Sequence, residues 1–365
     1  MLKRVFAAVV SAAMILCSIN VFAADEKVQY IALGDSIAAG YGLKYPDTQS
    51  YPALLANANK LTYVNYGVNG LTTTQLIDAI ESGQYDISGA DVITVSIGSN
   101  DLMRPMINTF AAEIGVNPNS ENFDKDVIDR IEYLKQNESA SQLKARLDRL
   151  EAKLVNNPEL LAICDNTSQV MIPKVAETIR AKNPKCQLIF TNYYNPYKNK
   201  ILVVPMSGSA QGEYPIGARV QTYIDRLNGG LAESDDYKIA DVYGNFTTAR
   251  YINANVDMRT AGVSFDPHPT ALGHRAIYLA VADVYDPLPE FMYGDANGDG
   301  QLDASDAAET MQKVLTENYK LGLEKKTSDW KKYVDVDANG FVDASDAADI
   351  LQKVLQDKYR FVVEK

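Results

Sequence analysis

The feature that most constrains the fold is the segment Ala90–Ile97, in which valine, isoleucine and threonine predominate. A run of this kind is typical of a strand buried on both faces of a parallel sheet. Other segments have the length and composition of strands, and the segments between them have the apolar spacing of helices. The further expected strands are Asp25–Leu33, Leu61–Tyr66, Gln187–Thr191 and Tyr237–Val242, and the expected helices are 50–59, 72–82, 168–182, 220–233 and 270–285.

Strands that alternate with helices predict an α/β domain, here a three-layer α/β/α sandwich around a parallel sheet. The segment 102–182 is charged and periodic, which indicates a helical insertion that covers one side of the sheet. Pro287 and Pro289 mark a boundary. We therefore expect a first domain over residues 24–290 and a second over residues 291–365.

Three of the predicted strands end in glycine-rich polar turns. Gly34-Asp35-Ser36 follows the first strand, Gly70 lies just beyond the second, and Gly98-Ser99-Asn100-Asp101 follows the third. In open parallel sheets, ligands bind beyond the carboxyl ends of the strands. The three turns therefore predict a site, and Ser36 has a helix N-terminus beside it whose free N–H groups suit an oxyanion.

A serine nucleophile needs a base, and the chain has only two histidines, His268 and His274. His268 stands between two prolines ahead of the last helix, where its backbone is restricted, so it is the predicted base. His274 falls inside that helix, and we interpret it as structural, either capping a turn or solvated.

With these residues assembled, the segment from Tyr30 to Val284 resembles the GDSL or SGNH family of serine esterases and lipases. The resemblance implies a flavodoxin-like SGNH hydrolase fold, with Ser36 as nucleophile and His268 as base. It also implies an oxyanion hole formed by the backbone N–H groups of Ser36 and Gly70 and the side-chain amide of Asn100. No catalytic cofactor is expected.

One position departs from the family pattern. Many members have an aspartate three residues before the histidine, where this chain has Phe265, and the aspartate here is Asp266. Either the Asp266 carboxylate orients the His268 ring, or a backbone carbonyl such as that of Phe265 does so. Asp35 is a rival carboxylate, and we expect it to tie down the nucleophile turn instead.

The first 23 residues have the pattern of a secretory signal peptide, with Lys3 and Arg4 ahead of a short apolar core and Val21-Phe22-Ala23 at the cleavage site. The core is too short for a membrane anchor, so we expect a secreted protein. Cys164 and Cys186 could pair after export or remain free thiols. The formal net charge of −12 argues against a nucleic-acid partner.

Two acidic twelve-residue stretches repeat one pattern at the C-terminus. Oxygen-bearing side chains recur at positions 1, 3, 5, 9 and 12, with glycine at position 6 and a carbonyl ligand at position 7, which is the pattern of a calcium loop. The predicted ligands are Asp295, Asn297, Asp299, Gln301, Asp303 and Asp306 in the first loop, and Asp335, Asp337, Asn339, Phe341, Asp343 and Asp346 in the second.

A duplicated loop followed by one helix resembles a type I dockerin, a small all-α module that docks secreted enzymes onto cohesin domains of a cellulosome scaffold. The resemblance covers Tyr293 to about Tyr359 and implies two structural Ca²⁺ ions and a cohesin partner. Near-identical outward residues suggest two equivalent binding faces. The predicted partner-binding residues are Ala304, Ser305, Gln312 and Lys313 on one face, and Ala344, Ser345, Gln352 and Lys353 on the other.

Together these features predict a secreted, cellulosome-associated carbohydrate esterase that deacetylates xylan, glucomannan or pectin. A general esterase, lipase or lysophospholipase is the alternative within enzymes. An inert binding module with vestigial catalytic blocks is the alternative outside them. Tyr193, Tyr194 and Tyr197 either stack on a sugar or pack beneath the insertion, and packing is the expectation.

Overall fold

The computed structural model describes residues 27–205, 211–232, 234–254, 266–356 and 358–364. The chain divides into two compact units, the first ending at Asp286 and the second beginning at Pro287. Within the described residues, no helix is long and apolar enough to cross a membrane. The predicted signal peptide lies outside the described residues.

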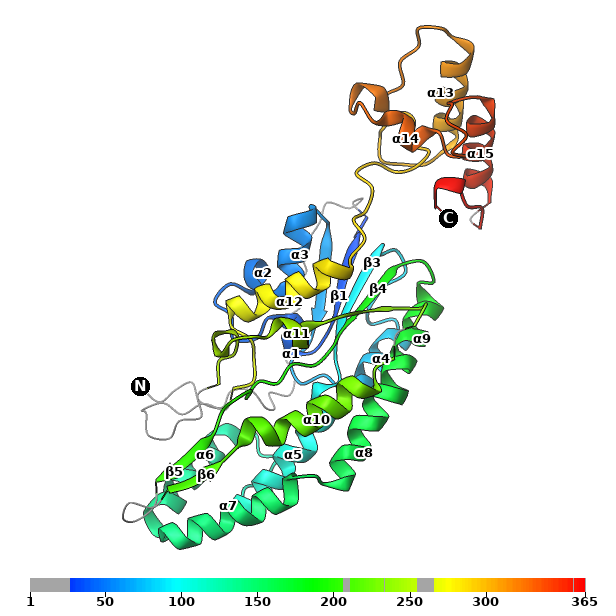
Figure 1. Cartoon of the computed structure of the whole chain (residues 1–365). Coiled ribbons are helices and arrows are strands. Elements are labelled where there is room, and N and C mark those ends of the chain that lie inside the picture. Colours follow the sequence, from blue (N-terminus) through cyan, green and yellow to red (C-terminus); the bar gives the residue numbers. More distant parts are fainter. Residues whose placement is uncertain (1–26, 206–210, 233, 255–265, 357, 365) are drawn as a thin grey trace. The chain divides into compact units, whose positions relative to one another are not determined.

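A parallel sheet forms the centre of the first unit, and its strands β1, β3 and β4 lie side by side (Figure 1). The sheet has five strands in the order β2-β1-β3-β4-β7. Because the strands are parallel, the carboxyl ends of β1, β2 and β3 lie at one edge, where Ser36, Gly70 and Asn100 follow them. The strand order also reverses direction at β1, and ligands bind at such points in open parallel sheets. The strands are β1 (Tyr30–Gly34), β2 (Tyr63–Gly67), β3 (Val92–Ser96), β4 (Gln187–Thr191) and β7 (Lys238–Ala240).

Side chains of each strand alternate between two helical layers. On one face, Ile93 and Val95 of β3 join a core with residues of α4 and α9. On the other face, the Thr94 hydroxyl lies 2.7 Å from the Tyr30 hydroxyl and 3.4 Å from the hydroxyl of Tyr51 at the start of α3. The predicted three-layer α/β/α sandwich is confirmed. Its helices are α1 (Ser36–Ala39), α2 (Pro46–Gln49), α3 (Tyr51–Asn59), α4 (Thr73–Glu81), α9 (Ile172–Lys182), α10 (Ile216–Gly230), α11 (Val242–Asn245) and α12 (Ala271–Val284).

A helical extension follows β3 and has cores of its own. Glu113 of α5 is buried and pairs with Arg149 at 3.0 Å and Lys153 at 2.8 Å, which ties α5 to α7. The elements of the helical extension are α5 (Ser99–Ile114), α6 (Phe123–Asn137), α7 (Ala140–Leu154), α8 (Pro158–Asn166) and the π-helix η1 (Thr167–Met171).

Two features of this region differ from the sequence expectation. The helix α9 packs in the sheet core through Ile172, Val175 and Ile179, so the extension ends before it rather than at residue 182. An antiparallel hairpin of β5 (Leu202–Pro205) and β6 (Gln211–Tyr214) stands ahead of α10, where no strands were expected. A short 3-10 turn, η2 (Ala249–Tyr251), precedes α12.

The second unit is helical and repeats one loop-and-helix arrangement. The helices α13 (Ala304–Leu315) and α15 (Ala344–Leu355) pack against each other, and both begin with a capping box. Two small cores, one around Leu321 and Val334 and one around Ile350 and Phe361, complete the unit. The connecting elements are η3 (Leu323–Lys325), α14 (Trp330–Val334) and η4 (Val362–Glu364).

Candidate active site

The nucleophile turn is shaped by Gly34 at the end of β1. Gly34 has a φ of 142°, and a Cβ there would lie 2.1 Å from the carbonyl oxygen of Ser96 on the neighbouring strand. Only glycine fits so close to that backbone. The Asp35 carboxylate then accepts the backbone N–H of Ile37 at 3.0 Å and caps α1, as expected from the sequence. Ser36 is therefore the first residue of the helix α1.

The structure brings Ser36 and His268 together, although 232 residues separate them in the chain. The Ser36 Oγ lies 2.8 Å from the His268 Nε2, within hydrogen-bond distance. On the opposite side of the ring, the His268 Nδ1 lies 2.6 Å from the Asp266 Oδ1. A hydroxyl, an imidazole and a carboxylate in this order form the arrangement of a nucleophile, a base and an orienting group.

The short spacing between Asp266 and His268 has a local explanation. The Asp266 Oδ1 also accepts the backbone N–H of His268 at 3.0 Å, so the side chain folds back over its own loop in an Asx turn. This turn points the carboxylate at the ring of the residue two positions ahead. Phe265, whose carbonyl was the alternative, lies outside the described residues.

Two tyrosines contact the loop that carries His268, and neither contact was expected from the sequence. The Tyr41 ring packs against the His268 imidazole with centroids 4.6 Å apart. The Tyr194 hydroxyl donates to the Pro267 carbonyl at 2.9 Å and so anchors the residue before the histidine. Neither tyrosine belongs to a periodic pattern that would single it out. Tyr193, Tyr194 and Tyr197 are all buried, in line with the expected packing role.

Two backbone donors of the expected oxyanion hole are free. Among the residues that the structure describes, the N–H groups of Ser36 and Gly70 donate no hydrogen bond within the chain. Gly70 adopts a φ of 76°, in the left-handed region that favours glycine. Unpaired N–H groups at this edge of the sheet are available to a ligand oxygen.

The third expected donor, Asn100, is already engaged. Its Nδ2 lies 3.0 Å from the Leu71 carbonyl oxygen and 3.4 Å from the Asp35 Oδ2. The contact with Asp35 is long for a hydrogen bond, so it is the one that a ligand oxygen can replace at least cost. Burial raises the pKa of Asp35 to about 7, an effect that its bond from Ile37 and the nearby His268 oppose.

His274 is neither solvated nor exposed. It is fully buried, and its Nδ1 accepts the backbone N–H of Tyr51 at 3.3 Å. Its Nε2 has no hydrogen-bond partner among the described residues. Burial lowers the pKa of His274 to about 3, and repulsion from His268 adds to the shift. The ring is therefore neutral and caps the start of α3.

The two cysteines are free thiols in separate cores. Cys164 packs with residues of α5, α8 and α10, whereas Cys186 belongs to the sheet core with α4 and α9. Burial raises the pKa of Cys164 to about 12 and that of Cys186 to about 11. The disulfide alternative is therefore wrong for this structure.

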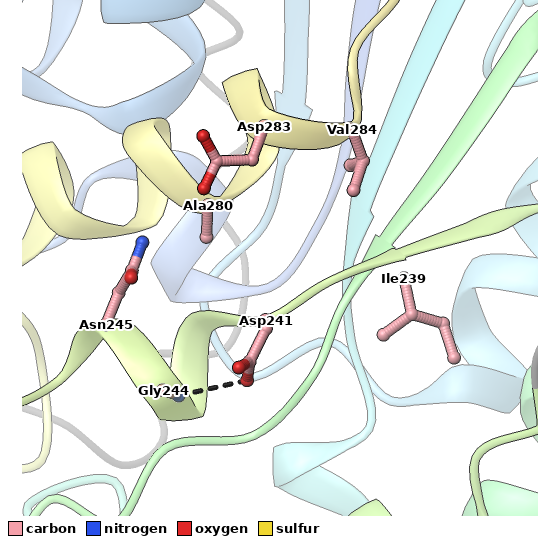
Figure 2. A pocket seen from close by; sticks show the side chains of 7 residues that line it. All are labelled: Ile239, Asp241, Gly244, Asn245, Ala280, Asp283 and Val284. Atoms are coloured by element: carbon pink, nitrogen blue, oxygen red, sulfur yellow. Dashed lines mark hydrogen bonds between the residues drawn. The ribbon is translucent and has the colours of Figure 1, made fainter.

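A hollow of about 370 Å³ lies between β7, α11 and α12 (Figure 2). None of the expected site residues lines it. Its Asp241 caps α11 by accepting the Gly244 N–H at 2.9 Å, and it also accepts the Asn192 amide at 2.8 Å. The Asp241 carboxylate in the lining is thus used to cap α11, and the Asn245 amide donates to the Ala276 carbonyl of α12 at 3.3 Å. The lining residues are Ile239, Asp241, Gly244, Asn245, Ala280, Asp283 and Val284.

The two acidic loops of the second unit share one internal geometry. In the first loop, the Asp295 carboxylate accepts the backbone N–H groups of Gly298 at 2.7 Å and Gly300 at 2.9 Å. In the second, the Asp335 carboxylate accepts those of Asn339 at 3.1 Å and Gly340 at 2.9 Å. The loop backbone is therefore wrapped around the first aspartate.

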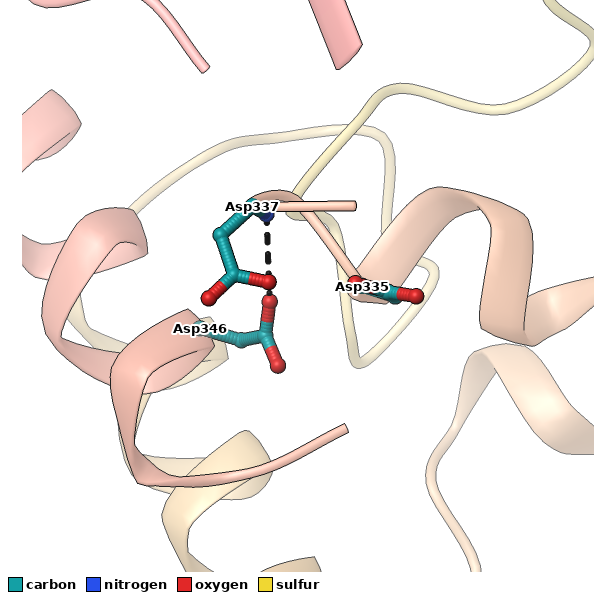
Figure 3. Close-up of side chains that lie close together, drawn as sticks. All are labelled: Asp335, Asp337 and Asp346. Carbon is teal, nitrogen blue, oxygen red and sulfur yellow. Dashed lines mark hydrogen bonds between the residues drawn. The ribbon is translucent and has the colours of Figure 1, made fainter. Parts of the chain in front are cut away.

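The last aspartate of each loop is buried and turned inward. Burial raises the pKa values of Asp306 and Asp346 to about 6 each. In the second loop, carboxylate oxygens of Asp335, Asp337 and Asp346 lie within 4.8 Å of one another (Figure 3). A cluster of oxygen donors with excess negative charge fits a hard cation such as Ca²⁺.

The remaining predicted ligands have less uniform roles. Asp303 and Asp343 at position 9 accept the backbone N–H groups of Ser305 and Ser345, each at 2.7 Å, and so cap α13 and α15. The Phe341 side chain is apolar and 72% exposed, so only its backbone carbonyl offers an oxygen ligand. Within the loops, Asn297 accepts the Asp299 N–H at 2.8 Å and Asp299 accepts the Gln301 N–H at 2.9 Å. In the second loop, Asp337 accepts the Asn339 N–H at 3.0 Å.

The predicted partner-binding residues lie on two similar faces. Those at the helix starts and the two glutamines are exposed. The lysines are tied down within the unit, because Lys313 pairs with Glu324 at 2.9 Å and Lys353 with Glu364 at 2.5 Å. The exposed members are Ala304, Ser305, Gln312, Ala344, Ser345 and Gln352.

Comparison with known proteins covers both units. The model of the GDSL-like lipase/acylhydrolase family matches residues 32–276, and that of the dockerin type I domain matches residues 293–355. A search among curated proteins found no match.

Solved structures of lipolytic enzymes are similar to the first unit. A phospholipase A1 from Streptomyces albidoflavus is 21% identical, with 71% of this chain and 99% of that chain covered and a TM-score of 0.42. An extracellular lipase from Streptomyces rimosus is 23% identical, with 70% and 98% covered and a TM-score of 0.42. From its family match, the chain belongs to the GDSL-like lipase/acylhydrolase family and carries a C-terminal type I dockerin domain.

Proposed function

We propose that this protein is a secreted serine ester hydrolase of a cellulosome that removes acetyl or other acyl groups from plant cell-wall polysaccharide. The observation that carries the proposal is the 2.8 Å contact between the Ser36 Oγ and the His268 Nε2, with Asp266 behind the ring. The polysaccharide substrate is supported by the dockerin, which implies binding to a cohesin.

In the proposed mechanism, His268 removes the Ser36 proton as the Oγ attacks the ester carbonyl. The Asp266 carboxylate keeps the Nδ1 proton in place and stabilises the imidazolium that forms. The backbone N–H groups of Ser36 and Gly70 and the amide of Asn100 bind the oxyanion. His268 then protonates the leaving alcohol, and a water molecule, activated by the same ring, hydrolyses the acyl-enzyme.

Type I dockerin domains bind calcium. We propose two Ca²⁺ ions, one in each acidic loop, which would neutralise the facing carboxylates and let the loops fold. We also propose that the two similar faces allow docking in two orientations. Substituting Ala344 and Ser345 alone should then leave cohesin affinity nearly unchanged, and a large loss from that single face would contradict the two-orientation model.

The first test is hydrolysis of 4-nitrophenyl acetate by the wild type and by Ser36→Ala. We expect the variant to lose about 10⁴-fold or more in turnover, because the attacking oxygen is missing. Full activity in Ser36→Ala would show that another residue is the nucleophile. An inactive wild type would favour the alternative of an inert binding module.

A general esterase or lipase is the second candidate, because the matching family includes lipases. The chain length of the acyl group separates the two functions. Acetate release from acetylated xylan, glucomannan and pectin supports the carbohydrate esterase. Faster hydrolysis of 4-nitrophenyl palmitate than of the acetate, with no acetate released from polymers, supports the lipase.

A further inference from the structure

One cation stands beside the proposed oxyanion hole and is not used by the proposed mechanism. Arg104 lies on α5 four residues after Asn100, so both side chains project from the same face of the helix. The Arg104 Nη2 donates to the Gly70 carbonyl at 3.0 Å, and the Asn100 Nδ2 donates to the Leu71 carbonyl at 3.0 Å. The guanidinium therefore borders the loop that presents the Gly70 N–H.

The space above Gly70 is open except on the side of this guanidinium. A Cβ placed on Gly70 would meet the Arg104 Nη2 at 3.9 Å, and apart from Gly70 and its two chain neighbours no other atom of the described chain lies within 4 Å of that position. The Arg104 guanidinium therefore contacts the same residue whose N–H is the proposed oxyanion donor, and it borders the open side of that residue.

The charge of Arg104 is not neutralised within the described part of the chain. Its side chain is exposed, and no carboxylate of a described residue lies within 4.0 Å of it. One of its five N–H donors reaches Gly70, which leaves others for a ligand. Four other arginines of the helical extension and α10 pair with carboxylates, namely Arg146, Arg149, Arg219 and Arg226, whereas Arg130 of α6 donates to the Ile114 carbonyl at 2.7 Å.

We propose that Arg104 is a specificity-determining residue that binds a sugar carboxylate of the substrate, so that the enzyme prefers acetylated polyuronides over neutral acetylated polymers. This inference rests on the proposed function. A guanidinium presents paired N–H groups that match a carboxylate in two parallel hydrogen bonds. Of the candidate polymers, pectin carries such carboxylates along its backbone.

The test compares two forms of one polymer. Acetylated polygalacturonate with free carboxylates and the same material after full methyl esterification differ in charge but carry the same acetyl groups. Acetate release is measured for the wild type, Arg104→Gln, Arg104→Lys and the control Lys182→Gln. Lys182 is an exposed cation at the end of α9, just before β4 begins, at the opposite edge of the sheet.

We expect the wild type to prefer the free-carboxylate form and Arg104→Gln to lower this preference on the order of tenfold. The glutamine variant also slows both reactions, because the Gly70 loop loses a bond, so the ratio of the two rates is the readout. Arg104→Lys should keep part of the preference, and Lys182→Gln should keep all of it. High salt should weaken the wild-type preference.

Three results would overturn the inference. The first is a wild type that cleaves both forms equally, and the second is an Arg104→Gln variant that slows both by the same factor. The third is hydrolysis of phosphatidylglycerol vesicles, faster than of either polymer and lost in Arg104→Gln, which would assign the anion to a lipid headgroup. The wild-type rate on neutral 4-nitrophenyl acetate keeps failure of the esterase proposal separate from failure of this one.

Discussion

The catalytic cluster and the acidic loops are assembled in opposite ways. Ser36 and His268 are 232 residues apart, and they meet because the loop ahead of α12 lies against the turn that follows β1. Asp335, Asp337 and Asp346 belong to one short loop and the helix start that follows it. The first site thus depends on tertiary packing, whereas the second depends on local geometry and on the ion it binds.

This difference predicts that calcium removal unfolds the second unit and leaves the first unit folded. In excess chelator, we expect the second unit to unfold, because its small cores cannot offset the repulsion among the loop carboxylates. Trp330 is the only tryptophan of the chain and lies in this unit, so its fluorescence reports on the second unit alone. Hydrolysis of 4-nitrophenyl acetate should remain unchanged. Loss of both signals together would show that the units do not fold independently.

Substitution of Asp266 tests the contact between its carboxylate and the His268 ring, which joins two residues close in sequence within the catalytic cluster. We expect Asp266→Ala to lose about 10⁴-fold in turnover, because the imidazolium would lose its carboxylate partner. Asp86→Ala is the matched control, since the Asp86 Oδ1 accepts the Ser88 N–H two residues ahead at 3.1 Å without touching a histidine. A loss below tenfold in Asp266→Ala would favour a backbone carbonyl as the orienting group.

Substitution of Asn100 should lower turnover less than substitution of Asp266 does. We expect Asn100→Ala to lower turnover about 100- to 1,000-fold with little change in the Michaelis constant, because the lost donor acts on the oxyanion. Asn59→Ala is the control, since the Asn59 amide also donates to a backbone carbonyl, that of Leu55, at 3.0 Å. Equal losses in the two variants would mean that Asn100 only supports the loop.

The last prediction concerns His274 and the pH dependence of stability rather than turnover. Because burial lowers its pKa from 6.5 to about 3, the unfolded chain binds a proton in this window that the folded chain does not. The free energy of unfolding contributed by this residue should therefore fall as the pH drops from 6.5 towards 3, by up to about 1.4 kcal/mol per pH unit.

Urea unfolding followed by circular dichroism at several pH values measures this slope. His274→Asn keeps a hydrogen-bond acceptor for the Tyr51 N–H but cannot titrate, so its unfolding free energy should depend less on pH. An unchanged slope in the variant would contradict the assignment to His274.

Most of the sheet was predictable from composition. The strand Gln187–Thr191 was expected with the bounds it has, because it is short, apolar and flanked by turns. The hairpin β5–β6 was missed, since strands of four residues carry too few side chains to show an alternation. The expected strand Tyr237–Val242 shortens to Lys238–Ala240, because Asp241 ends it by capping α11.

The sequence by itself determined the parallel sheet, the identity of the candidate nucleophile and base, and the doubled acidic loop. These depend on apolar periodicity and on residues at fixed spacing, which a linear pattern records. Only the tertiary structure decided which carboxylate faces His268, that Cys164 and Cys186 lie in different cores, and that Asn100 already has partners. Those outcomes depend on distances of a few ångströms between segments far apart in the chain, which spacing along a sequence does not encode.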